Sequence, residues 1–270
     1  MKQVIHLLEN ISKGLSEWFS NNQMKANPDK FHLLLSNKER ETISIGETRV
    51  HNSNCEKILG IKFDNDLKFG SHLEDICKKA SSKLHALSRA TPYMDFPKKK
   101  LLLNAFFLSQ FNYCPLIWMN HSRSLNNRIN RLHERCLRLI YYDKNSSFDE
   151  LLELDGSFTI HHRNLQSLAT EMYKVSNGQC VPILQSLFVR REQNRYNLRN
   201  NSEFQLPLVH SVTHGTESIS FLGPKIWELI PDDIKNLQSV DSFKLAIKKW
   251  KPENCPCRNC KVYIAGVGFL

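Results

Sequence analysis

The chain has 270 residues, 41% of them hydrophobic, and carries 37 Lys and Arg against 27 Asp and Glu, a net charge of +10. This length allows one large domain or two modest domains with a hydrophobic core. The longest apolar runs are far shorter than the roughly 20 residues needed to cross a bilayer, and the N-terminus lacks the apolar region of a signal peptide. We therefore expect a soluble intracellular protein, in the nucleus or cytoplasm, that is not secreted and does not bind a membrane.

The first 70 residues predict a helix followed by short antiparallel strands. Apolar residues recur at a helical period over 4–20. Residues 31–35 and 57–63 have the length and composition of strands, and residues 42–50 alternate about a glycine as a hairpin does.

Residues 71–155 predict a bundle of helices. A first helix is opened by a Ser71–Glu74 capping box and ends near Thr91. A second helix begins at Pro97, runs through Leu108 and is kinked or interrupted at Pro115. A third covers 125–140, and a short fourth helix is opened by a Ser147–Glu150 capping box.

Residues 156–270 give a weaker pattern, with helices expected over 163–175 and 243–250. The expected fold class is therefore α+β and predominantly helical. It has three regions: 1–70 with small antiparallel strands, 71–155 as a helical bundle, and a mixed region over 156–270.

Positive charge is concentrated in the predicted bundle. Residues 71–142 contain twelve Lys and Arg against four Asp and Glu, so this segment carries +8 of the +10. Such a block is expected of a surface that binds a polyanion, although a solvated helical face would have the same composition. The candidate nucleic-acid-binding residues are Lys78, Lys79, Lys83, Lys98, Lys99, Lys100, Arg128, Arg131, Arg135 and Arg138.

Four of these residues form a row on the third predicted helix. Arg128, Arg131, Arg135 and Arg138 are spaced by three, four and three residues, which places them on one side of a helix, beside its apolar stripe. One flank would pack against the bundle while the other would face phosphate groups.

An ordered series of residues resembles the reverse transcriptase of a non-LTR, jockey-like retrotransposon, in the part that follows the catalytic aspartates. The series is Leu15, Trp18, Asn22, Met24-Lys25, Asn27-Pro28, Lys30, Leu59-Gly60-Ile61 and Asp64, continued by Leu67 to His72, Arg123 to Leu139 and Trp227 to Leu270. The resemblance implies a palm remnant over 1–70, a thumb-like domain over 71–155 that holds a template–primer duplex, and a C-terminal region ending in cysteines. It also implies that Leu59, Gly60 and Ile61 lie in a primer-grip-like element, and that the partner is RNA or an RNA–DNA hybrid.

The chain departs from this family at the catalytic site. It contains no Tyr/Phe-Ala-Asp-Asp box, and its one Asp-Asp pair, Asp232-Asp233, follows a proline where carboxylates favour a helix N-terminus. Polymerase chemistry needs paired carboxylates that hold two metal ions, which in the intact family enzyme are Mg²⁺. We therefore expect no catalytic residues and no polymerase activity in this chain alone, unless a further chain supplies the missing palm.

Three cysteines near the C-terminus, Cys255, Cys257 and Cys260, offer thiolates for a zinc ion. Zinc prefers four ligands, and the nearest upstream candidates are His214, His210 and Cys180, all distant in sequence. A reduced surface cluster, or a site completed by another chain, is the competing interpretation. These cysteines favour a second hypothesis for function, a zinc-dependent or protein-interaction module derived from the element. A third hypothesis is a truncated gene product without a function.

Two further groups of residues have structural interpretations. His133 and Cys136 are spaced as a Cys–His pair might be, but Cys136 lies on the apolar stripe and is expected in the core. His161 and His162 are adjacent, so they point to different faces and make poor joint ligands. Phosphate contact or a polar cap is expected for them.

Overall fold

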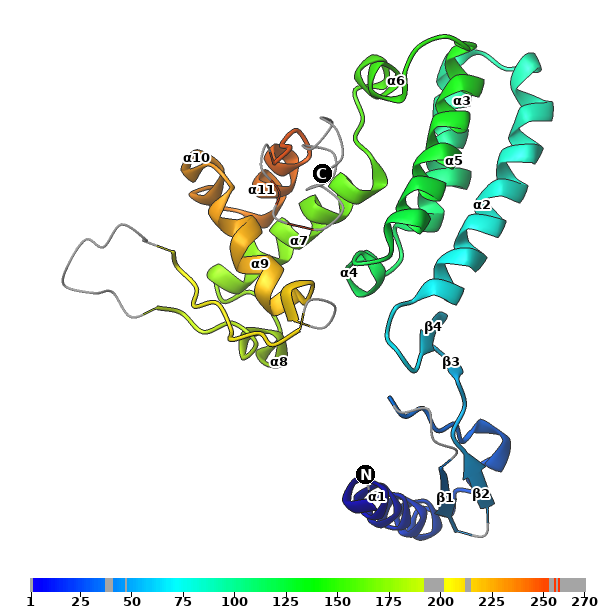
Figure 1. Ribbon diagram of the computed structural model, residues 1–270, viewed down its shortest axis with the longest axis vertical. Coiled ribbons are helices and arrows are strands. Elements are labelled where there is room, and N and C mark those ends of the chain that lie inside the picture. Colours follow the sequence, from blue (N-terminus) through cyan, green and yellow to red (C-terminus); the bar gives the residue numbers. More distant parts are fainter. Residues whose placement is uncertain are drawn as a thin grey trace. The chain divides into compact units, whose positions relative to one another are not determined.

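The structure is a computed structural model that describes residues 2–36, 41–46, 48–191, 202–211 and 215–252, together with Cys255 and Cys257. It is predominantly helical with two small antiparallel sheets, which confirms the predicted α+β class. The chain divides into two compact units, Met1–Asp75 and Ile76–Leu270. Figure 1 shows the elements of both.

The N-terminal unit consists of one long helix, one short 3-10 turn and two hairpins. The elements are α1 (Lys2–Asn21), η1 (Pro28–Lys30), β1 (Thr42–Ile45) paired with β2 (Thr48–His51), and β3 (Cys55–Ile58) paired with β4 (Ile61–Asp64). Its core is small: Leu33, Leu35, Ile43 and Val50 are buried, and one edge of α1 packs against them. The helix over 4–20 and the hairpin over 42–50 are as predicted.

The two other strand predictions in this unit were wrong. Residues 31–35 form only an isolated bridge, between Leu33 and Asn52. Residues 57–63 do not continue as one strand, because Leu59 and Gly60 adopt positive φ angles of 48° and 88° and turn the chain back into a β3–β4 hairpin. A left-handed residue cannot continue an extended strand, and glycine accepts it at little cost.

In the described part of the second unit the regular elements are helices (Figure 1). In chain order they are α2 (Gly70–Ala90, which begins in the first unit), η2 (Thr91–Tyr93), α3 (Phe96–Leu102), the π-helical turn η3 (Leu103–Phe107), η4 (Leu108–Phe111), α4 (Pro115–Trp118), α5 (Arg123–Tyr141), α6 (Phe148–Asp155), α7 (Ile160–Ser176), α8 (Pro182–Gln185), α9 (Ile219–Glu228), α10 (Asp232–Lys235) and α11 (Val240–Ile247). We call α2 to α6 the helical block and α7 to α11 the C-terminal lobe. No helix in the described part of the chain is long and apolar enough to cross a membrane.

Of the two capping boxes predicted from the sequence, one is formed and one is not. The capping box before α6 is formed. Ser147 Oγ accepts from the Glu150 backbone N–H at 3.3 Å, and the Glu150 carboxylate accepts from the Ser147 backbone N–H at 2.6 Å. The predicted capping box at Ser71 is not formed, because α2 already begins at Gly70. There the Asp64 carboxylate accepts the Gly70 N–H at 3.2 Å.

In the C-terminal lobe, α7 lies at the centre of the core. Eleven of its seventeen residues are buried, and α9 and α11 pack against it. Tyr173 of α7 stacks on Phe243 of α11 with ring centroids 4.3 Å apart, and its hydroxyl donates to the Leu237 carbonyl at 2.5 Å. Met119, Cys255 and Cys257 belong to the same core cluster, so the end of α4 and these two cysteines pack into the core around this helix.

Candidate metal centre and basic helical surface

The structure brings a histidine to the C-terminal cysteines. Thr159 caps α7 by accepting from His162 N at 3.2 Å, which makes His161 the second residue of the helix and buries its ring. Cys255 and Cys257 reach this point from the segment after α11. Gln166 of α7 holds that segment by donating to the carbonyls of Lys248 (3.3 Å) and Trp250 (2.9 Å).

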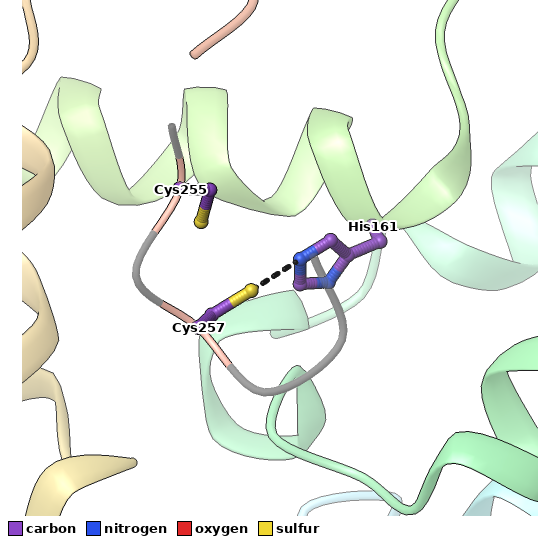
Figure 2. Close-up of side chains that lie close together, drawn as sticks. All are labelled: His161, Cys255 and Cys257. Atoms are coloured by element: carbon purple, nitrogen blue, oxygen red, sulfur yellow. Dashed lines mark hydrogen bonds between the residues drawn. The ribbon is translucent and has the colours of Figure 1, made fainter. Parts of the chain in front are cut away.

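His161, Cys255 and Cys257 form a compact buried group (Figure 2). The Nε2 atom of His161 lies 3.1 Å from the Cys257 Sγ atom, and the three ligand atoms all lie within 4.8 Å of one another. In a tetrahedral zinc site, bond lengths of about 2.0–2.3 Å separate neighbouring ligand atoms by roughly 3.5 Å. Small movements would therefore allow the group to hold a metal ion, and two thiols with an imidazole are the donors that zinc prefers.

A cavity of about 1020 Å³ borders this group. His161 and Cys255 line its wall, and the exposed residues Lys248, Lys249 and Lys251 lie along it. The cavity therefore borders two of the three residues of the group.

The structure describes two of the three cysteines that the sequence offered as metal ligands. Cys255 and Cys257 meet His161, whereas Cys260 lies outside the described residues, as does His214. The two other upstream candidates are not in the group: His210 is exposed, and Cys180 Sγ donates to Gln185 Oε1 at 3.0 Å.

Sequence reasoning missed His161. The two adjacent histidines do point to different faces, but that leaves one of them free to face the cysteines. His162 Nδ1 instead lies 3.0 Å from Thr159 Oγ1. No spacing rule connects His161 to Cys257, because 96 residues separate them.

Two further histidines of this unit, His121 and His162, have lowered pKa values. Burial lowers the pKa of His121 to about 4, and the charge of His161 lowers it further. Hydrogen bonds with the Trp118 carbonyl and the Asn126 side chain oppose this shift. Burial also lowers the pKa of His162 to about 4, with His161 again contributing. These imidazoles are therefore neutral at physiological pH and can act as metal ligands or as hydrogen-bond partners.

The His133–Cys136 pair has the core role that its apolar surroundings predicted. Cys136 is buried, and burial raises the pKa of its thiol to about 12, so the reactive thiolate is not formed near neutral pH. His133 packs between aromatic rings, 5.7 Å from the Phe107 centroid and 5.6 Å from that of Phe148.

A basic surface lies on α5. Arg128, Arg131 and Arg135 are exposed, while the buried residues of the helix, among them Ile129 and Cys136, face the core. None of the three arginines forms an ion pair within the part of the chain that the structure describes. On α2, Lys78 and Lys79 are exposed in the same way, and Lys83 is half-buried, with its ammonium 6.0 Å from the Phe106 ring centroid.

The remaining basic candidates have partners inside the protein. Lys99 is buried with its ammonium 4.0 Å from the Tyr142 ring centroid, and Lys100 pairs with Asp155 at 3.1 Å. Arg138 pairs with Glu134 at 2.6 Å and donates to the carbonyls of Asp143 and Ser146. Lys98 pairs with Asp95 at 2.9 Å on the surface.

The segment Leu59-Gly60-Ile61 is the turn of the β3–β4 hairpin. Leu59 is 86% exposed at its tip and Ile61 is buried at the start of β4. Asp232 and Asp233 open the short helix α10, as their position after Pro231 predicted.

Comparisons of the chain with protein-family models, with curated proteins and with solved structures found no match.

Proposed function

We propose that this chain is the C-terminal portion of a reverse transcriptase from a non-LTR, jockey-like retroelement, and that it binds RNA or an RNA–DNA hybrid. The observation that carries the proposal is the row of exposed arginines on α5, Arg128, Arg131 and Arg135, which have no acidic partner among the described residues. The ordered series of family-like residues supports the same assignment. The activity proposed is binding alone, because the sequence contains no catalytic Asp-Asp box.

The physical reason for the proposal is the cost of leaving such charges unpaired. Arg138 on the same helix, by contrast, is paired with Glu134 at 2.6 Å. A row of unpaired guanidinium groups repels itself and gains most from a polyanion, whose condensed counter-ions are released on binding. Guanidinium groups also match phosphate oxygens with two parallel hydrogen bonds.

The test is binding of an RNA–DNA hybrid across a salt series. The logarithm of the affinity should fall linearly with the logarithm of the salt concentration. In the R128Q/R131Q/R135Q variant the slope should become shallower by up to about 3 units, since each phosphate contact contributes about 0.9. The matched control is K174Q/K235Q/K244Q, which removes the same charge from the C-terminal lobe, where each lysine is paired with an acid.

The control separates a local surface from a general effect of net charge. If both variants change the slope equally, the arginine row is not the binding surface. Salt-independent or undetectable binding by the wild-type chain refutes the nucleic-acid proposal as a whole.

We also propose that His161, Cys255 and Cys257 bind a zinc ion that fastens the C-terminal tail to α7. The specific observation is the buried group itself, in which both cysteines belong to the core cluster of the C-terminal lobe. When bound, the ion would supply a structural cross-link between segments that are far apart in sequence.

Metal content measured by mass spectrometry tests this second proposal. The wild-type chain should contain about one zinc ion, as expected for a single tetrahedral site. C255S/C257S should contain none, whereas C180S, the matched control outside the group, should keep the wild-type content. A metal-free wild-type protein that also fails to take up added zinc refutes the proposal.

A further inference from the structure

The described metal-binding group has three members, whereas a structural zinc site has four protein ligands. The identity of the fourth ligand decides which segments the metal joins. The described residues offer two more histidines near the group, His121 and His162, and the hydrogen bonds of their rings distinguish them.

His121 lies in the turn between α4 and α5, which packs on the C-terminal lobe. Met119, two residues earlier, is in the same core cluster as Cys255 and Cys257, and the ring of His121 is itself buried. Asn126, in the first turns of α5, lines the same cavity as His161 and Cys255. The turn after α4 therefore borders the metal-binding group.

The hydrogen bond of His121 to the Trp118 carbonyl identifies which ring nitrogen carries the lone pair. Its Nδ1 atom lies 3.0 Å from the Trp118 carbonyl oxygen, which can only accept, so Nδ1 carries the proton and Nε2 carries the lone pair. Nε2 is buried and has no hydrogen-bond partner of normal geometry among the described residues. Metal-binding histidines commonly have this arrangement, in which one ring nitrogen donates to a carbonyl and the other binds the ion.

His162 differs from His121 in this respect. Its Nδ1 atom lies 3.0 Å from the Thr159 hydroxyl oxygen, and neither of its ring nitrogens is a buried atom without a hydrogen-bond partner among the described residues. The hydrogen bonds therefore favour His121 over His162.

We propose that the Nε2 atom of His121 is the fourth ligand of a tetrahedral zinc site completed by His161, Cys255 and Cys257. The inference rests on the zinc site proposed above. His121 is not within the 4.8 Å group, so the side chains must close around the ion on binding. Because Ser122 caps α5, the ion would join the start of the helix that carries the arginine row to α7 and to the C-terminal tail.

Cobalt titration of the full chain tests this ligand set, because Co²⁺ in a tetrahedral thiolate site gives visible d–d bands and near-ultraviolet thiolate charge-transfer bands. C260S should bind Co²⁺ like the wild type, with the charge-transfer intensity of two thiolates. H121Q should bind at least about tenfold more weakly. H162Q, the matched control on a neighbouring histidine, should keep wild-type affinity.

H121C in the C260S background guards against the chance that H121Q only impairs folding. The new thiol should restore tight binding and raise the charge-transfer intensity to that of three thiolates, a change that a merely structural His121 would not produce. If C260S loses the tetrahedral spectrum while H121Q keeps it, Cys260 is the fourth ligand and the inference is overturned. Loss in H162Q with retention in H121Q overturns it as well. A wild-type chain that binds no Co²⁺ refutes the zinc site itself.

Discussion

Replacing His133 of α5 by leucine should make the protein more resistant to acid. The side chain is completely buried, and neither ring nitrogen has a hydrogen-bond partner among the described residues. Burial, with a smaller contribution from Arg163, lowers the pKa of His133 from 6.5 to about 4. Leucine has a similar volume and nothing to protonate, so H133L keeps the packing against Phe107 and Phe148 and removes the titration.

The sign of the effect follows from the two pKa values. The unfolded chain takes up a proton near pH 6.5, while the folded chain does so only near pH 4, so acidification favours unfolding between these values. The stability contributed by the neutral ring is complete above pH 6.5 and is lost as the pH falls toward 4. From pH 7 to pH 5 the loss is about 2 kcal/mol for this one group. It corresponds to roughly 4–8 °C in Tm for a unit of this size.

Thermal unfolding of wild type and H133L at pH 7 and pH 5 measures this loss directly. H133L should lose about 2 kcal/mol less than the wild type over this interval. The remaining pH dependence should include the contributions of His121 and His162. The control F107L, which disturbs the same packing without a titratable group, should lower Tm equally at both pH values. Parallel pH dependence of wild type and H133L would refute the reasoning.

Three further substitutions test the packing of the helical block and of the C-terminal lobe. D155N removes the charge from a buried carboxylate that pairs with Lys100 at 3.1 Å, and should cost about 1.5–3 kcal/mol in urea unfolding; a loss below about 0.5 kcal/mol would contradict the buried pairing. G223A places a Cβ atom 2.7 Å from the Sδ atom of the buried Met172, and should lower stability by about 1–3 kcal/mol, measured by thermal unfolding; an unchanged Tm would mean that α7 and α9 are less closely packed than described. S147A removes the capping box of α6 and should cost about 1 kcal/mol by the same measurement, an expectation that equal stability of the two proteins would contradict.

The helices could be predicted from the sequence because an amphipathic stripe of 15 or more residues has few alternative interpretations. Among the short elements, the hairpin over 42–50 and α6 were predicted, but the strands over 31–35 and 57–63 were wrong. Residues 57–63 contain enough apolar side chains for a strand, but the positive φ angles at Leu59 and Gly60 turn the chain, and an apolar run does not reveal them. At the start of α2 the local pattern Ser71–Glu74 was overridden by a more distant group, the Asp64 carboxylate.

The candidate sites show the same limit for contacts between distant residues. Cysteine spacing indicated a metal site, but its histidine comes from α7 and is brought there by the packing of the C-terminal lobe. Charge counting located the segment of the chain where Lys and Arg are concentrated. It could not distinguish Arg131, which is exposed, from Lys99, which is buried against Tyr142. Lysine and arginine count equally in composition, whatever they contact in the fold.

The arginine row and the metal centre are held by different interactions. The row on α5 is positioned by the buried side of that helix, where Ile129 and Leu137 are fully buried and His133 stacks on Phe107. The segment after α11 is held by the hydrogen bonds from Gln166 to the Lys248 and Trp250 carbonyls, and its Cys255 and Cys257 lie in the group with His161. Because none of the side chains that hold α5 in the helical block is a ligand, loss of the metal should release the tail without dispersing the arginines. The proposed phosphate binding and the proposed metal binding should therefore be separable by substitution, and each proposed function can fail without the other.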